Sequence, residues 1–194
     1  MKITFLNQKG GVGKSHIALL VAGTLAKANH KVAIDDRDEQ GTLTHWTKTV
    51  GNVPLLKDCP EADFTIIDTP GHLKLDNNVV HKQVARTIEE SDRLILVTEM
   101  SDACVHGSVI MAAMISEYKR KDAAAKVLFN KVRKQTLIGQ RSQKDLAKIL
   151  KLPALKHYVP LSAAYERAYT AGWGEITGKD RETILMLTME ILSK

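Results

Sequence analysis

The chain has 194 residues, a length that suits one domain with a continuous core and is too short for two large domains. Its composition, 44% hydrophobic and 26% charged, is ordinary for a soluble globular protein, and no apolar run approaches the roughly 20 residues of a membrane span. No signal peptide precedes the first predicted strand, and Cys59 and Cys104 lack metal or redox spacing, so we expect a cytoplasmic protein with reduced thiols. The net charge of +6 becomes informative only once it is located along the chain.

The hydrophobic pattern alternates between short apolar runs, which predict strands, and residues at helical spacing, which predict helices. In chain order it predicts a strand at 2–7, a helix at 15–28, a strand at 31–35, a helix at 43–49, a strand at 64–68 and a helix around 80–88. There follow a strand at 94–97, a helix at 105–118, a strand at 127–130, a helix at about 140–150, a strand at 157–161, and helices at 163–171 and 181–192. Continuous apolar strands alternating with helices are typical of a parallel sheet covered on both faces. The sequence therefore predicts a single α/β domain over residues 1–194, with a mostly parallel sheet between two helical layers.

The first predicted strand runs directly into the glycine-rich stretch KGGVGKS, residues 9–15. This stretch, placed between a strand and a helix, is typical of a phosphate-binding loop, because glycines let successive N–H groups point at phosphate oxygens and the helix adds its positive end. Lys14 would neutralise the β- and γ-phosphates of a nucleotide, and the Ser15 hydroxyl would bind Mg²⁺. Two features are unusual: Gln8 replaces the first glycine of the ordinary pattern, and a second lysine, Lys9, precedes Lys14 by five residues.

Two acidic turns follow apolar strands, so both are expected at the carboxyl edge of the sheet, where open α/β folds bind ligands. In IIDTPG, Asp68 is suited to hold Mg²⁺ through water, and the N–H of Gly71 is free for the γ-phosphate. In DDRDEQG, Asp36 and Asp38 stand two residues apart, so that one could orient the metal and the other the attacking water. The three motifs together predict a Mg²⁺-dependent nucleotide hydrolase.

The stretches KGGVGKS, DDRDEQG, IIDTPG and FNKV, with VPLSAAYERAYTAGWG near the end, resemble the deviant Walker A ATPases of the ParA/MinD family. The resemblance runs nearly end to end, and the late stretch is most similar to the small plasmid-partition ParA proteins that lack an N-terminal DNA-binding domain. It implies the three-layer P-loop NTPase fold. Because the first strand is predicted at residue 2, no helix-turn-helix domain is expected before it.

The resemblance also implies roles for the motif residues. In that family the extra lysine, here Lys9, reaches across an ATP-bound dimer to the phosphates of the other subunit; Asp38 would position the catalytic water, and Asn130 would hydrogen-bond adenine. The implied nucleotide contacts are Lys9, Gly10, Gly11, Val12, Gly13, Lys14, Ser15, His16, Gly71 and Asn130; the implied metal site is Ser15, Asp36 and Asp68; and Lys9, Lys14, Asp38 and Asp68 would serve catalysis. Departures from the family pattern are Glu39 and Gly71, which replace prolines and could change how the switch loops move, and Ser15, which replaces the commoner threonine.

The positive charge is concentrated between residues 117 and 151, where eleven lysines and arginines face three acidic residues. Arg141, Lys144, Lys148 and Lys151 follow helical spacing, which predicts one basic helix face opposite the apolar residues Leu146, Ile149 and Leu150. Such a surface is typical of phosphate-backbone contacts, and the lack of aromatic interleaving argues against base reading. Nonspecific duplex DNA is the expected partner; the alternative is a solvated lysine face.

The interpretation is a slow, partner-stimulated ATPase for plasmid or chromosome segregation. It would act as an ATP-dependent homodimer on the nucleoid, with a small centromere-binding protein as its partner and without stable membrane association. One alternative is a MinD-like membrane ATPase, although the tail RETILMLTMEILSK carries only Lys194 near its end and is expected to pack on the sheet. Another is a ParA-like ATPase that positions a protein cargo. A ligase such as dethiobiotin synthetase and an electron-transfer iron protein are weaker alternatives.

Overall fold

The computed structural model describes residues 1–193 and is built around a five-stranded sheet. The strands are β1 (Lys2–Leu6), β2 (Val32–Asp36), β3 (Phe64–Asp68), β4 (Arg93–Thr98) and β5 (Ala124–Phe129), in the spatial order β2-β3-β1-β4-β5. Each adjacent pair of these strands is parallel. The prediction of a parallel sheet is therefore confirmed.

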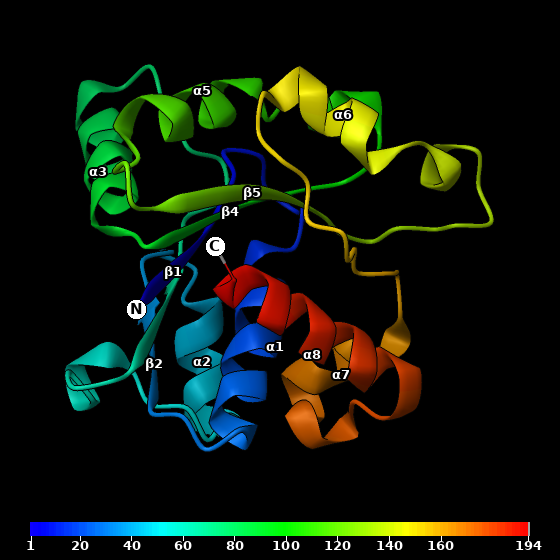
Figure 1. The fold of residues 1–194 in the computed structure, drawn as a ribbon. Coiled ribbons are helices and arrows are strands. Elements are labelled where there is room, and N and C mark those ends of the chain that lie inside the picture. The colour runs from blue at the N-terminus through cyan, green and yellow to red at the C-terminus, as the bar shows by residue number, and fades with distance from the viewer. Residues whose placement is uncertain (194) are drawn as a thin grey trace.

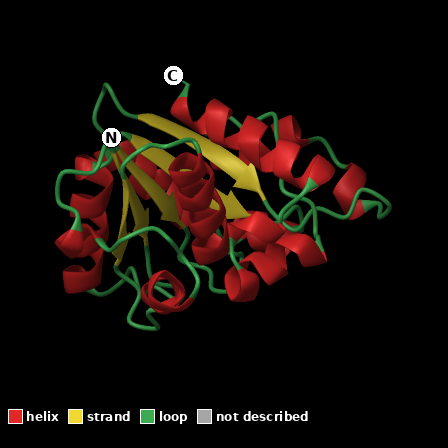
Figure 2. Ribbon diagram, turned by 90° about the horizontal axis from the view of Figure 1, so that it is seen from below, coloured by secondary structure: helices red, strands yellow, loops and turns green. Residues whose placement is uncertain are grey.

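Helices cover both faces of the sheet (Figures 1 and 2). One layer contains α1 (Lys14–Lys27), α2 (Thr42–Thr49), α7 (Ala163–Ala171) and α8 (Gly178–Leu192). The other contains α3 (Asn78–Glu90), α4 (Asp102–His106), α5 (Val109–Tyr118) and α6 (Gln143–Leu150). Short 3-10 turns lie at Leu56–Asp58, Ile138–Gln140 and Trp173–Glu175. The arrangement is the three-layer α/β architecture that the sequence predicts.

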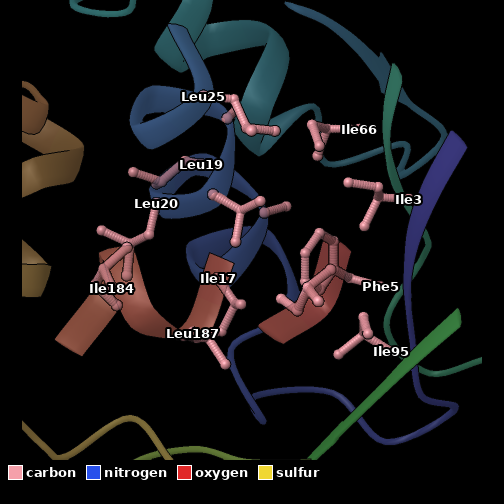
Figure 3. Packing of buried hydrophobic residues seen from close by; sticks show 14 of the residues in the cluster. Ile3, Phe5, Ile17, Leu19, Leu20, Leu25, Ile66, Ile95, Ile184 and Leu187 are labelled. Atoms are coloured by element: carbon pink, nitrogen blue, oxygen red, sulfur yellow. The ribbon is translucent and has the colours of Figure 1, made fainter. Parts of the chain in front are cut away.

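The helix that follows the phosphate loop is buried almost all round. Side chains of α1 such as Ile17 and Leu20 have no exposed surface; they lie between Phe5 of the sheet and the inner face of α8, as Figure 3 shows. Burying one large aliphatic side chain contributes about 1.5–3 kcal/mol to the free energy of unfolding. The inner face of α8 is formed by Ile184 and Leu187, so the carboxy-terminal helix packs on the protein, as predicted.

The predicted strand at 157–161 is wrong. This segment buries Val159, but it forms an isolated bridge, between Pro160 and Val132, and no regular ladder; a second isolated bridge, between Ala154 and Val127 of β5, lies before the segment. Pro153, which precedes the segment, and Pro160 within it have no N–H to donate, so a regular ladder cannot continue along this part of the chain. The sheet of the described residues therefore ends at β5.

Two predicted helices have different limits in the structure. The helix predicted at 105–118 is divided into α4 and α5 at Ser108, whose buried hydroxyl contacts Asn7 and the Cys104 carbonyl. The helix predicted from about 140 begins at Gln143, because the Ser142 side chain accepts a hydrogen bond from the N–H of Asp145 and caps the helix there. In residues 1–193 no helix combines the length and apolar character that crossing a membrane requires.

Candidate nucleotide-binding site

The carboxyl ends of three neighbouring strands bring the predicted motifs together. The phosphate loop follows β1, the turn DDRDEQG follows β2, and the turn IIDTPG follows β3. Asp68 lies opposite both Phe5 of β1 and Asp36 of β2 in the strand register, so the ends of the three strands are level. The motifs line a cavity of about 420 Å³ that contains Lys14, Ser15, Asp38 and Gly71.

The phosphate loop adopts a conformation that requires glycine. Gly11 and Gly13 have φ angles of 78° and 91°, in the left-handed region. A Cβ atom at Gly13 would lie 2.3 Å from Nδ2 of Asn130, which donates a 2.9 Å hydrogen bond to the Val12 carbonyl. Gly13 is the N-cap of α1, and no side chain of residues 1–193 caps this helix. Its first N–H groups are therefore available to an anion.

Lys14 is buried beside carboxylates. Its side chain belongs to the cavity, and the residue is only 5% exposed. Burial lowers the pKa of the Lys14 ammonium, and the charges of Asp68 and Asp38 oppose that shift. Lys14 is thus placed to neutralise a phosphate group entering the cavity.

Asp68 is a buried carboxylate without a hydrogen-bond partner. It has no exposed surface, and neither oxygen has a hydrogen-bond partner among the described residues. Burial raises the pKa of Asp68 to about 7, while the nearby Ser15 hydroxyl and Lys14 ammonium limit the rise. An unpaired carboxylate next to a serine hydroxyl fits Mg²⁺, which takes few protein ligands and completes its shell with water and phosphate oxygens. The described residues contain no cluster of three or more His, Cys, Asp or Glu residues suited to hold a metal on their own.

The two carboxylates of the DDRDEQG turn are held differently. Asp36 accepts hydrogen bonds from the backbone N–H of Asp38 (3.2 Å) and Thr44 (2.7 Å), so it organises the turn and the start of α2. Asp38 lines the cavity and accepts from the N–H of Gly71 at 3.3 Å. The N–H expected to serve a γ-phosphate is therefore bonded to Asp38 in this structure.

Lys9 points away from the cavity. Its ammonium donates to the Cys104 sulfur at 3.1 Å, and its backbone N–H donates to the Asn7 side chain at 3.0 Å. Asn7 is in turn fixed by the Val97 carbonyl and the Ser108 hydroxyl. The two lysines of the loop thus lie on different sides of it.

Several residues near the cavity were not assigned from the sequence. Glu166 and Tyr169 of α7 line it. His16 of α1, which was expected to contact the nucleotide, also lines the cavity and donates from Nε2 to the carbonyl of Tyr165 on α7. Burial lowers the pKa of His16, and the Tyr165 carbonyl opposes the shift. Lys131, counted with the basic stretch, donates instead to the Gly11 carbonyl at 2.6 Å. Glu166 and Tyr169 are three residues apart and therefore share one face of a helix. This spacing is the only signal in the sequence that could have indicated a helix face directed at the site.

The predicted basic helix face needs correction. Of its four residues only Lys144 and Lys148 lie in α6, because Arg141 precedes the helix and Lys151 ends it with φ 52°. Arg141 pairs with Asp102 at 2.7 Å, and Lys148 with Asp145 at 2.7 Å. Ile149, expected on the inner face, is 38% exposed, whereas Leu146 and Leu150 are buried as expected. The four residues therefore do not form one continuous face of a helix.

Comparisons with known proteins agree with this geometry. The family model described as "CobQ/CobB/MinD/ParA nucleotide binding domain" matches residues 3–172. The chain is 26% identical over 184 residues to the maintenance of carboxysome distribution protein A of Gloeobacter kilaueensis, covering 88% of this chain and 81% of that protein. Its fold is similar to the MinD cell division protein of Aquifex aeolicus, with a TM-score of 0.75 at 13% identity, covering 100% of this chain and 97% of that one. A putative plasmid partition protein from Borrelia burgdorferi, solved with AMPPNP, gives a TM-score of 0.64 at 18% identity, covering 98% and 96%.

The family match spans the phosphate loop, both acidic turns and α7, the elements that line the cavity. The solved structures share the fold of the whole described chain. The chain therefore belongs to the CobQ/CobB/MinD/ParA family of nucleotide-binding domains and is a ParA/MinD-like ATPase.

Proposed function

We propose that this protein, as a single domain, is a ParA-type partition ATPase that forms a homodimer bridged by ATP and Mg²⁺. In that state it binds nonspecific DNA, and a small centromere-binding partner releases it by stimulating hydrolysis. The observation that carries the proposal is the separation of the two loop lysines. Lys14 lies in the phosphate cavity beside Asp68 and Asp38, whereas Lys9 contacts Cys104 outside it.

This separation supports a role for Lys9 at another subunit. Two ammonium groups directed at the same phosphates would repel each other, and Lys14 already occupies the cavity. The Lys9 contact with Cys104 is a single hydrogen bond to sulfur, which is a weak acceptor. We propose that Lys9 leaves this contact to reach the phosphates of a second subunit.

Within one subunit the cavity residues support the proposed hydrolysis. Lys14 and the N–H groups at the start of α1 would hold the phosphates, and Ser15 with Asp68 would hold Mg²⁺. Bound Mg²⁺ would neutralise the charge that develops on the phosphates. Asp38, directed into the cavity, would orient the attacking water, and Asp36 would keep the turn in place. Asn130 holds the loop at Val12, and its contact with adenine stays a prediction.

Sedimentation velocity tests the dimer. We expect wild-type protein to be a monomer with ADP and a dimer with an uncleavable ATP analogue and Mg²⁺, and Lys9→Ala to bind the analogue while remaining a monomer. Lys57→Ala, which removes an exposed charge far along the chain from the loop, is the control. A wild-type monomer at saturating analogue, or unchanged pairing of Lys9→Ala, would contradict the proposal.

A second candidate function is the positioning of a protein cargo on DNA. It is favoured by the relative from Gloeobacter kilaueensis, whose name refers to carboxysome distribution. Deleting the gene separates the candidates: loss of a plasmid or chromosome supports partition, whereas dispersal of a protein assembly with normal DNA inheritance supports the second function.

Co-sedimentation with anionic liposomes and ATP tests the MinD-like alternative; we expect no binding.

A further inference from the structure

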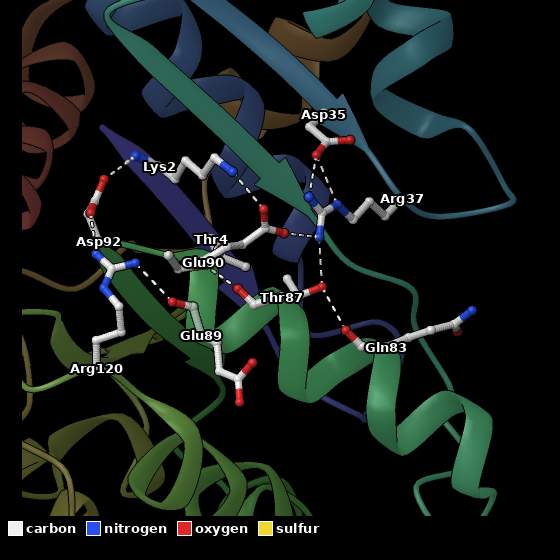
Figure 4. A network of polar contacts seen from close by, with 11 residues as sticks. Lys2, Thr4, Asp35, Arg37, Gln83, Thr87, Glu89, Glu90, Asp92 and Arg120 are labelled. Carbon is white, nitrogen blue, oxygen red and sulfur yellow. Dashed lines mark hydrogen bonds and ion pairs between the residues drawn. The ribbon is translucent and has the colours of Figure 1, made fainter.

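Arg37 stands between the two carboxylates of the DDRDEQG turn but points to the other side of it. Because side chains alternate along an extended chain, Arg37 shares a face with Asp35, while Asp36 and Asp38 share the opposite face. Figure 4 shows Arg37 directed at α3, with Asp35 above it and Glu90 beside it. The turn is therefore held from the side that faces away from the phosphate cavity.

Three groups bind the guanidinium. Nε and Nη2 donate to one carboxylate oxygen of Asp35 at 2.9 and 2.6 Å, and Nη1 donates to the Thr87 hydroxyl at 2.7 Å. Nη1 also pairs with Glu90 at 2.5 Å. Burial alone lowers the pKa of Arg37, but the bonds to Asp35 and Glu90 outweigh it, so that the pKa lies above its usual value. These pairs are partly shielded from water, since the side chains of Arg37 and Glu90 are 31% and 32% exposed.

The acceptors are themselves fixed. Thr87 also donates to the Gln83 carbonyl within α3, and Glu90 also pairs with Lys2 of β1 at 2.6 Å. Helix α3 directly follows the loop 69–77, which carries Gly71. The turn is thus bonded at two places to the segment formed by this loop and α3. At the cavity, Asp38 accepts from the N–H of Gly71 in the loop, and outside the cavity, Arg37 donates to Thr87 of α3.

We propose that Arg37 is a positioning residue for hydrolysis: by tying the DDRDEQG turn to α3, it holds Asp38 at the phosphate cavity. The inference rests on the proposed role of Asp38 in orienting water. A displacement of about 1 Å in such a group can reduce a rate by about a hundredfold. A neutral residue would lack the positive charge that pairs with the two carboxylates, and an acidic residue would repel them.

Single-turnover hydrolysis and equilibrium nucleotide binding test this role. We expect Arg37→Ala to reduce the hydrolysis rate by about tenfold or more while the ATP Kd changes by less than about threefold. Arg37→Lys should recover part of the rate. A lysine ammonium can pair with Glu90, but it lacks the planar guanidinium that donates to Asp35 from two nitrogens while a third contacts Thr87. The matched control is Arg120→Ala: Arg120 pairs with Asp92 and bonds the Glu89 carbonyl of α3 but does not contact the turn. Its rate should stay within about twofold of wild type.

The outcomes separate this inference from the function on which it rests. Equal losses in Arg37→Ala and Arg120→Ala, or a wild-type rate in Arg37→Ala, would overturn the positioning role, whereas an inactive Asp38→Ala would still support the proposed function. A wild-type rate in Asp38→Ala would overturn both. If Arg37→Ala does not fold, Glu90→Gln replaces it; a rate reduced by about threefold with unchanged Kd supports the inference, and an unchanged rate opposes it.

Discussion

At the scale of single residues, the buried carboxyl group of Asp68 links the stability of the protein to pH. Its carboxylate is fully buried, lacks a hydrogen-bond partner in residues 1–193 and has its pKa raised to about 7. The native state therefore keeps a proton on Asp68 up to about pH 7, whereas an unfolded chain releases it near pH 4. Between these values the native state holds more protons, so this group makes the protein less stable as the pH rises.

Asp68→Asn removes that titration. In EDTA and without nucleotide, we expect the free energy of unfolding of Asp68→Asn relative to wild type to rise by roughly 1–3 kcal/mol between pH 5 and pH 8. Urea unfolding at both pH values measures it, with Asp58→Asn, which changes an exposed carboxyl, as the control. The same relative stability at both pH values would contradict the burial argument. Mg²⁺ with nucleotide should stabilise wild type but not the variant.

The sequence predicted those site residues whose roles follow from local motifs. Lys14, Ser15, Asp38 and Gly71 line the cavity as expected, because a motif between a strand and a helix fixes its own position at the sheet edge. Lys131 and Glu166 were missed because they reach the loop from distant parts of the chain. The ion pair between Arg37 and Glu90 of α3 could not be predicted either, because no local sequence pattern pairs residues so far apart.

At the scale of elements, the alternation of strands and helices was sufficient to predict the sheet and its two helical layers. The errors arose where local signals compete with tertiary contacts. The apolar residues at 157–161 fit a strand, but prolines interrupt the pairing, and Ser108 divides a helix because its hydroxyl has buried partners. Helical spacing likewise placed Arg141 and Lys151 on α6, although both lie outside its ends.

Helix α6 provides a test of the DNA interface at this scale. Lys144 and Lys148 are both exposed, and we expect Lys144→Ala/Lys148→Ala to weaken binding to plain duplex DNA and to reduce the slope of log K against log salt by about two. Lys27→Ala/Lys31→Ala is the matched control, because it removes the same charge from exposed positions near the end of α1. Fluorescence anisotropy at several salt concentrations gives both quantities. If both double variants lose the same DNA affinity, only the net charge of the protein matters. If Lys144→Ala/Lys148→Ala binds DNA as tightly as wild type, α6 is not part of the DNA interface.

At the scale of the whole molecule, the order β2-β3-β1-β4-β5 places the strands that carry the three motifs next to one another. The cavity lies at their carboxyl ends, and α6 packs on the opposite layer from α7 and α8. One subunit thus keeps the phosphate site and the proposed DNA-binding helix apart. A nucleotide bound in the cavity could control DNA affinity by changing the number of subunits that associate, without a conformational change in α6.

This argument predicts a coupling between dimerisation and DNA binding. A dimer presents two copies of α6, so the salt slope of DNA binding should about double when an uncleavable ATP analogue replaces ADP. Lys9→Ala should bind the analogue, remain a monomer and show the ADP slope with either nucleotide. Because binding free energies are reciprocal, DNA should strengthen the wild-type dimer by the same factor that dimerisation strengthens DNA binding. Anisotropy and sedimentation on the same samples measure both factors; unequal factors, or a doubled slope in Lys9→Ala, would mean that DNA affinity is set within each subunit.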